Sequence, residues 1–294
     1  MVIENQARAC SVAIFAHNLS GVIVRCIESV LASKGKLDLR IYVLANGCTD
    51  GTICEIERQY AEVEHVNLIN IPIADKANAW NHYVHRIATI QSTHIFIDGD
   101  VVPAPDSLIR LIESLDSQPE ANAVGAVPSV GRDRAGWVHR MIRFGRVSGG
   151  LYGLTGKFVN YLISNQIKIP NGFVGEDFLL SAWAKDLWGN EGLYTSNPKL
   201  VIEERATFAF RQLSLMRLAD AKTYFKRLVR YRLRDYQLGM LMHYFESHGI
   251  DYIPLSVEEI YQLAGKPPGY YWRGKSTPID WLAVFKIRQA WRGK

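Results

Sequence analysis

Short apolar runs alternate with longer segments of periodic apolar residues through the first part of the chain. Runs typical of buried strands lie at 12–16, 39–45, 66–71 and 94–97. Between them apolar residues recur every three or four positions, as at Ile23, Ile27 and Val30, which predicts helices beginning near residues 23, 52, 75 and 108. Strands alternating with helices imply βαβ units, so the pattern predicts an α/β fold with a mostly parallel sheet flanked by helices.

Polar residues follow three of these predicted strands directly. His17-Asn18 follows the first strand, Asn46 to Thr52 the second and Asp98-Gly99-Asp100 the fourth. Ligands of open α/β sheets bind beyond the carboxyl ends of the strands. We therefore expect these three segments to meet at one edge of the sheet and to form a ligand site.

The charge of the chain is divided unevenly. The 294 residues carry a net charge of +5, but residues 1–128 hold 9 basic and 15 acidic side chains, and residues 129–294 hold 25 and 14. A composition of 48% hydrophobic residues argues against disorder. We divide the chain into an acidic, ligand-binding half (1–128), a middle part (129–204) and a basic, mainly helical extension (205–294).

Several features favour a cytoplasmic protein. The four cysteines lie within the first 54 residues and match neither a disulfide framework nor a zinc pattern, so we expect reduced thiols. The first residues do not resemble a signal peptide, and no apolar run reaches the roughly 18 residues of a membrane span.

The basic extension offers a surface for other partners. Phe225, Val229 and Leu233 recur at helical spacing among Lys and Arg residues, so residues 217–236 predict a basic amphipathic helix. Such a helix can lie on the anionic inner face of a membrane, and an ordinary helix with a solvated charged face is an equal alternative. No nucleic-acid motif accompanies the charge, so we expect no nucleic-acid partner.

Two carboxylate motifs could carry chemistry. Asp98 and Asp100 could hold a hard divalent cation, Mn²⁺ or Mg²⁺, although an isolated triplet of this kind can also be a solvated turn. Glu176 and Asp177 open a predicted helix, where they could cap the N-terminus or supply a catalytic base. The segment 46–52 and the segment from Lys76 could contact a ligand or simply start helices.

In their order along the chain these segments, with 13–18, 148–153 and 169–177, resemble glycosyltransferase family 2, the inverting, nucleotide-sugar-dependent glycosyltransferases with the GT-A (Rossmann-like) fold. The resemblance covers about residues 10–235, and it implies that residues 1–128 bind the donor and residues 129–204 the acceptor within one GT-A domain. It implies a cation on Asp100 and Asp98, and Asp177 as general base supported by Glu176. The donor contacts it implies are Ala16, Asn18, Asn46, Asp50, Lys76, Asn81, Asp98, Gly99, Arg211, Gln212 and Arg217. The acceptor contacts are Gly149, Gly150 and Trp183.

The resemblance implies transfer of a hexosyl or N-acetylhexosaminyl group from a nucleoside-diphosphate sugar, UDP favoured. The expected acceptor is a saccharide or lipid-linked hydroxyl in bacterial-type polysaccharide or glycoconjugate synthesis. Two departures matter: many members carry Asp where this chain has Asn46, and Gln212 lacks the Arg and Trp of the processive synthases. A sugar nucleotidyltransferase would need a Gly-rich loop after the first strand. A non-catalytic nucleotide-sugar or membrane-surface binding protein is the other alternative.

Overall fold

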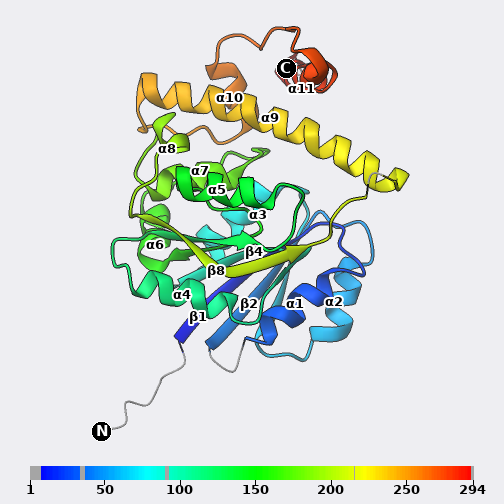
Figure 1. Cartoon of the computed structure of the whole chain (residues 1–294), viewed down its shortest axis with the longest axis vertical. Coiled ribbons are helices and arrows are strands. Elements are labelled where there is room, and N and C mark those ends of the chain that lie inside the picture. Colours follow the sequence, from blue (N-terminus) through cyan, green and yellow to red (C-terminus); the bar gives the residue numbers. More distant parts are fainter. Residues whose placement is uncertain (1–7, 34–36, 90–92, 215, 293–294) are drawn as a thin grey trace.

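A single mixed sheet organises the molecule in the computed structural model, which describes residues 8–33, 37–89, 93–214 and 216–292 (Figure 1). Its eight strands have the order β3-β2-β1-β4-β7-β6-β8-β5. Parallel pairing joins β1 to β2 and β4, β2 to β3, and β6 to β8. Antiparallel pairing joins β7 to its two neighbours and β5 to β8. The predicted α/β class with a helix-flanked sheet is confirmed.

The first half follows the predicted alternation. Its strands are β1 (Arg8–Ala16), β2 (Leu37–Asn46), β3 (Val66–Ile71) and β4 (Thr93–Asp98). Its helices are α1 (Ile23–Leu31), α2 (Thr52–Tyr60), α3 (Lys76–His82), which continues as a π-turn at Tyr83–Ile87, and α4 (Ser107–Asp116). Val12 and Ile14 of β1 pack in one apolar cluster and Ala13 and Phe15 in the other, because successive side chains of a strand point to opposite faces. Burial of both faces explains why these strands are continuous apolar runs.

The middle of the chain contains elements that the sequence analysis did not predict. Strands β5 (Val101–Pro103), β6 (Ala123–Pro128), β7 (Leu151–Thr155) and β8 (Leu200–Phe210) complete the sheet. Helices α5 (Arg134–Phe144), α6 (Gly156–Ser164) and α8 (Glu191–Tyr194) accompany the predicted helix α7 (Glu176–Ala184). The division expected between residues 204 and 205 falls inside β8, which pairs with β6 and β5. The helical extension therefore begins after Phe210.

A long helix, α9 (Leu218–His248), crosses the domain on the side of α5 and α7 (Figure 1). Its C-terminal half packs into the main apolar cluster through Leu238, Leu241, Met242 and Phe245. Helices α10 (Val257–Leu263) and α11 (Thr277–Arg292) pack against α9. None of the described helices has the length and apolarity that crossing a bilayer requires.

One buried carboxylate fastens α11 to α9. Asp280 of α11 is fully buried, with Oδ1 3.2 Å from Arg232 Nε of α9 and 3.3 Å from Arg273 Nε. The Tyr236 hydroxyl of α9 donates to the same carboxylate at 3.1 Å. A buried charge with three partners tolerates its loss of hydration, so this contact fixes how α11 sits on α9.

Candidate active site

Two cavities meet at the carboxyl ends of β1 and β4. The strand-end cavity, of about 510 Å³, is lined by residues that follow β1 and β2, among them His17 and Asn46. The α9 cavity, of about 390 Å³, lies between β7, α7 and α9 and is lined by Gly149, Asp177 and Arg234 among others. Six residues line both cavities: Lys76, Asp98, Asp100, Val174, Glu176 and Arg230.

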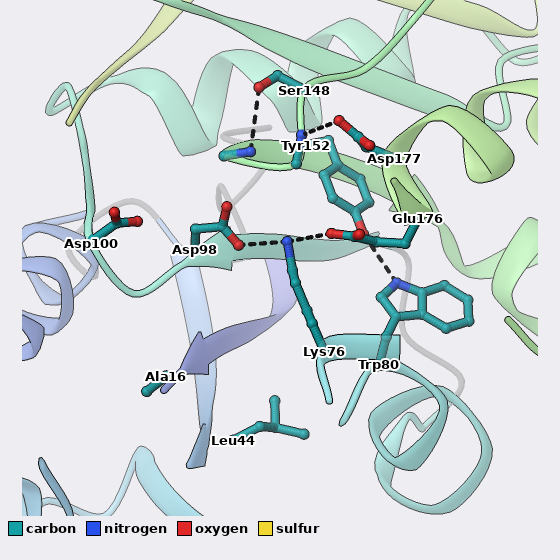
Figure 2. Close-up of polar contacts among 12 residues, drawn as sticks. Ala16, Leu44, Lys76, Trp80, Asp98, Asp100, Ser148, Tyr152, Glu176 and Asp177 are labelled. Carbon is teal, nitrogen blue, oxygen red and sulfur yellow. Dashed lines mark hydrogen bonds and ion pairs between the residues drawn. The ribbon is translucent and has the colours of Figure 1, made fainter. Parts of the chain in front are cut away.

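The shared wall is built around Lys76. Its Nζ lies 2.5 Å from Asp98 Oδ1 and 2.5 Å from Glu176 Oε1, so one ammonium joins the end of β4 to the start of α7 (Figure 2). Lys76 stands at the first position of α3 because Asp75 caps that helix, its Oδ1 accepting from Ala77 N at 3.0 Å. Asp75 Oδ2 also accepts from Gly172 N at 2.8 Å. The turn before α7 is thereby tied to the start of α3.

Burial and neighbouring opposite charges have opposing effects on the pKa values of the ionisable residues in this wall. Burial alone would lower the pKa of Lys76, but Asp98 and Glu176 raise it well above its ordinary value. Burial raises the pKa of Asp98 more than Lys76 lowers it. At Glu176 burial also favours the neutral form, yet Lys76 outweighs it and the net pKa is lowered. Glu176 therefore carries the counter-charge of Lys76 most firmly.

The turn after β4 presents two carboxylates to both cavities. Gly99 N donates to Phe15 O of β1 at 2.9 Å. A Cβ at Gly99 would lie 2.9 Å from the backbone oxygen of Phe15 and 2.8 Å from a methyl of Leu19, so a larger residue would force the backbone to shift. Asp98 and Asp100 flank this locked position, and Arg227 of α9 approaches Asp100 Oδ2 to 4.0 Å.

These two carboxylates fit a divalent cation that arrives with its ligand. Among the described residues no three His, Cys, Asp or Glu side chains form a metal-holding group. Mg²⁺ and similar hard cations are commonly held by one or two carboxylates, with the remaining positions filled by substrate phosphates and water. Asp98 and Asp100 supply such a partial set of oxygen donors on the wall of both cavities.

Asp177 lies on the α9 cavity, held by backbone donors. Its Oδ2 accepts from Gly149 N at 3.1 Å, the dashed line at Asp177 in Figure 2. Its Oδ1 accepts from Phe178 N at 3.0 Å. Burial and then the charge of Glu176 raise the pKa of Asp177 to about 6, against the opposing effects of Lys76 and Arg234. A carboxylate of this kind can take up a proton near neutral pH, as a general base must.

The loops after β1 and β2 hold each other in place. Asn46 lines the strand-end cavity, and its Nδ2 donates to Ala16 O at 2.9 Å. Asp50 accepts from Thr52 N at 3.0 Å and from Ser20 N at 3.1 Å, so it caps α2 and binds the other loop. Asn18 accepts from Thr49 N at 2.8 Å. Neither cavity is lined by Ala16, Asn18 or Asp50, which hold the loops beside the strand-end cavity through these contacts.

Asn81 and Trp183, which were predicted to contact ligands, make their contacts with other residues of the protein. Asn81 exchanges two hydrogen bonds with the backbone of Ile169, at 2.7 and 2.9 Å, and so braces the segment before α7. Trp183, expected at the acceptor, is fully buried in the apolar core against Trp188, with ring centroids 5.4 Å apart. That expectation was wrong because the apolar stripe of α7 turns Trp183 away from the cavity.

The basic residues at the cavity differ from those predicted. Arg211 pairs with Asp220, with Nη2 2.6 Å from Oδ1, and neither Arg211, Gln212 nor Arg217 lines either cavity. They follow β8 on the way to the start of α9, and the chain reaches the cavity only further along that helix (Figure 1). The side chains that α9 supplies are Arg227, Arg230, Tyr231 and Arg234. Their spacing of three and four residues was visible in the sequence, but the side of the helix that faces the cavity was not.

An aromatic wall is the other feature that the sequence analysis missed. Trp137 of α5 and Phe208 and Phe210 of β8 line the α9 cavity. The Trp137 and Phe210 ring centroids lie 6.0 Å apart. Gly150, on the same cavity, must be small because a Cβ there would lie 2.7 Å from the Phe208 ring. These rings come from segments about 70 residues apart, and no local pattern links them.

Comparison with known proteins agrees with this architecture. The sequence model of glycosyl transferase family 2 matches residues 11–174, more than half of the chain. No curated protein sequence matches the chain.

Solved structures of similar fold include three glycosyltransferases. The mannosyltransferase PcManGT from Pyrobaculum calidifontis, in complex with GDP-Man and Mn²⁺, is 17% identical with a TM-score of 0.60, covering 97% of this chain and 77% of that one. Glucosyl-3-phosphoglycerate synthase from Mycobacterium tuberculosis, in complex with Mn²⁺, UDP-glucose and phosphoglyceric acid, is 17% identical with a TM-score of 0.54, covering 90% and 82%. S. aureus TarS 1–349 in complex with UDP-GlcNAc is 13% identical with a TM-score of 0.53, covering 96% and 81%.

Proposed function

The chain belongs to glycosyl transferase family 2, and on that premise we propose that it moves a sugar from a nucleoside-diphosphate sugar to an acceptor hydroxyl with inversion at the anomeric carbon. One observation carries the proposal: the Asp98–Asp100 turn and Asp177 stand on cavities that share a wall. A donor bound across the strand ends would place its anomeric carbon near that wall, within reach of an acceptor in the α9 cavity.

The strand-end cavity is the proposed donor site. It collects Asn46, the start of α3 and the Asp98–Asp100 turn at the carboxyl ends of parallel strands, where α/β sheets bind nucleotides. A divalent cation, Mn²⁺ or Mg²⁺, held by Asp100 and Asp98 would offset the negative charge that builds on the departing diphosphate. Similar structures hold Mn²⁺ with UDP-glucose or GDP-mannose, so a hexosyl or N-acetylhexosaminyl donor is favoured, with UDP as the first nucleotide to test.

Asp177 is the proposed general base. In an inverting transfer the acceptor hydroxyl attacks the anomeric carbon from the face opposite the leaving diphosphate and loses its proton to a carboxylate. Asp177 lines the acceptor side, is held by Gly149 N, and has a pKa raised to about 6. Glu176 keeps Lys76 in place and, by its charge, strengthens the proton affinity of Asp177.

The decisive experiment is a calorimetric screen of UDP, GDP and dTDP sugars with and without Mn²⁺. We expect one nucleotide to bind tightly only when Mn²⁺ is present and to yield free nucleoside diphosphate with a saccharide or lipid-linked acceptor. Tight nucleotide-sugar binding without any transfer would favour the non-catalytic alternative. Release of pyrophosphate from a nucleoside triphosphate and a sugar phosphate would favour a nucleotidyltransferase.

An anionic membrane surface is part of the proposal, and the last part of the chain contributes to it together with residues 217–236. Val229, Leu233 and Tyr236 of that segment pack against the protein. Other apolar side chains of the segment are exposed, with Leu218 91% and Phe225 45% exposed, and so are side chains in the last part of the chain, with Trp272 81% and Phe285 56% exposed. Basic residues flank the last two: Arg273, Lys275, Lys286 and Arg292. Aromatic and basic side chains together suit the interface of an anionic bilayer.

The membrane proposal is tested by flotation with phosphatidylcholine vesicles, with and without phosphatidylglycerol. We expect binding only to the anionic vesicles and its loss in a Trp272→Ser, Phe285→Ser variant. Tyr194→Ser, which removes an equally exposed aromatic ring elsewhere, should bind as the unaltered protein does. Vesicle-independent sedimentation would instead indicate self-association. The unpaired thiols Cys10, Cys26, Cys48 and Cys54 suit a reducing compartment and support the cytoplasmic face.

A further inference from the structure

The face of α9 that points into the protein changes character along its length. Towards its C-terminus the inward stripe is apolar, with Leu238, Leu241 and Phe245 buried in the core. One to three turns earlier the same side of the helix carries Arg230 and Arg234, which line the α9 cavity. Arginines on the inward side of a helix add nothing to a hydrophobic core. A cation that loses part of its hydration at the wall of a cavity costs free energy unless a counter-charge lies beside it.

The carboxylates of the site do not fully account for these arginines. Lys76 already contacts Asp98 and Glu176 at 2.5 Å, and Arg227 is the α9 residue that approaches Asp100. Among the described residues, the ion pair found for Arg234 is with its neighbour Asp235 at 3.5 Å. The Nε of Arg234 is buried and has no hydrogen-bond acceptor within that same part of the structure. A buried guanidinium nitrogen of this kind calls for an acceptor, and the oxygen of a bound anion would supply one.

Arg234 is also held rigidly beside the proposed base. Its guanidinium lies 4.3 Å from the ring centroid of Phe178, the residue after Asp177, and 5.2 Å from that of Tyr231. Its aliphatic stem packs on Gly175, where a Cβ would collide with Arg234 Cγ and Cδ. Gly175 has φ +96°, a left-handed conformation that suits glycine. The start of α7 is therefore shaped to admit this one arginine.

The geometry points to an acceptor that carries an anionic group, phosphate or carboxylate, bound by Arg234 with Arg230 while its hydroxyl faces Asp177. Arg234 lines the α9 cavity and is not among the residues of the strand-end cavity, which separates this group from the donor diphosphate. The aromatic wall of Trp137, Phe208 and Phe210 offers a flat surface for the ring or apolar part of the same acceptor. This inference rests on the proposed function, because it names the acceptor class of that site.

The test titrates inorganic phosphate, and acetate in parallel, into protein already saturated with UDP and Mn²⁺, so that the donor subsite is filled. We expect saturable binding of at least one anion and, in Arg234→Gln, a loss of about tenfold or more in its affinity. Arg230→Gln, which alters an exposed side chain, should weaken binding in the same direction. Lys226→Gln removes the same charge from an exposed position of α9 that lines neither cavity, and should bind the anion normally.

Binding of UDP with Mn²⁺, measured separately, distinguishes the two proposals. Unchanged UDP affinity in Arg234→Gln with lost anion binding supports the acceptor assignment. Equal anion affinity in Arg234→Gln and the unaltered protein, or no anion binding once UDP is bound, overturns it and leaves the donor site standing. If none of UDP, GDP and dTDP binds, the proposed function fails, and the anion titrations of the nucleotide-free protein and its Arg234→Gln variant still decide whether the arginine site exists. Arg234→Lys, which keeps the charge and most of the stem, should retain part of the affinity and guards against a folding defect.

Discussion

The two cavities of this protein share a wall yet are built in different ways. The strand-end cavity is formed largely by the ends of β1, β2 and β4 and the loops after them, and its charged groups are carboxylates, Lys76 and Arg230. The α9 cavity adds arginines and aromatic rings from α5, β8 and α9. A parallel sheet brings strand ends together automatically, whereas the second cavity depends on a helix added after the sheet is complete. The first arrangement suits a ligand common to many enzymes and the second suits a specific acceptor.

Of the substitutions proposed, Asp177→Asn should affect the functions of the two cavities most differently. Loss of the base should lower kcat by about 10³-fold, within the range of general-base catalysis. The affinity for UDP with Mn²⁺ should stay within about twofold, because Asp177 does not line the strand-end cavity. Steady-state kinetics and calorimetry check both, with the exposed Asp251→Asn as control. Full activity in Asp177→Asn would remove it from the mechanism.

Lys76→Met should damage both cavities at once. Removing the ammonium leaves Asp98 and Glu176 facing each other without a counter-charge, and breaking a buried pair of this kind costs about 3 kcal/mol. Urea unfolding measures the loss, and UDP binding and kcat should fall together. Lys157→Met, at an exposed position remote from both cavities, should be nearly neutral. An unchanged free energy of unfolding in Lys76→Met would show that the shared wall does not depend on it.

Asp100→Ala should act on the donor side. Loss of one of two carboxylates should weaken Mn²⁺-dependent UDP binding by about 100-fold, to near the affinity without metal. Phosphate binding by nucleotide-free protein is the matched readout for the α9 cavity and should change less than fivefold, by rough estimate, because the ion pair between Asp100 and Arg227 is long, at 4.0 Å. Equal losses at both sites would contradict the separation of the cavities.

Gly175→Ala should disturb the entrance of α7 and little else. The left-handed φ of +96° and the collision with Arg234 predict a loss of about 2 kcal/mol in unfolding free energy. Gly239→Ala is the matched control, since that glycine lies within α9 with nothing near its Cβ position and should gain about 0.5–1 kcal/mol. Chemical denaturation of both variants checks the contrast.

The pH dependence should report Asp177. Its protonated form cannot accept a proton, so kcat should fall about tenfold per pH unit below its pKa of about 6 and level off above it. Glu176 raises this pKa by its charge, so Glu176→Gln should shift the acid limb to lower pH. A pH–rate profile with no limb in this region, or an upward shift in Glu176→Gln, would assign the base elsewhere.

The strands in the first half of the chain could be predicted from the sequence more completely than those in the second half. Strand β3 has the predicted bounds, and β1, β2 and β4 extend the predicted runs by a few residues. These strands could be predicted because a strand that is buried on both faces is a continuous run of apolar residues in the sequence. Strands β6 and β7 were missed because small residues such as Gly125 and Gly153 interrupt their apolar character. Strand β8 was missed because Glu203, Glu204 and Arg205 interrupt its apolar residues.

The sequence alone determined the alternating α/β layer, the placing of polar groups after its strands and the Asp98-Gly99-Asp100 turn, since these depend on residues close together in the chain. Only the tertiary structure decided that Trp183 lies in the core, that Arg211 pairs away from the site and that Arg230 and Arg234 face the cavity. A helix such as α9 has apolar and basic residues on several sides. The side that turns inward is selected by packing against α7 and α11, which lie up to about 60 residues away in the sequence.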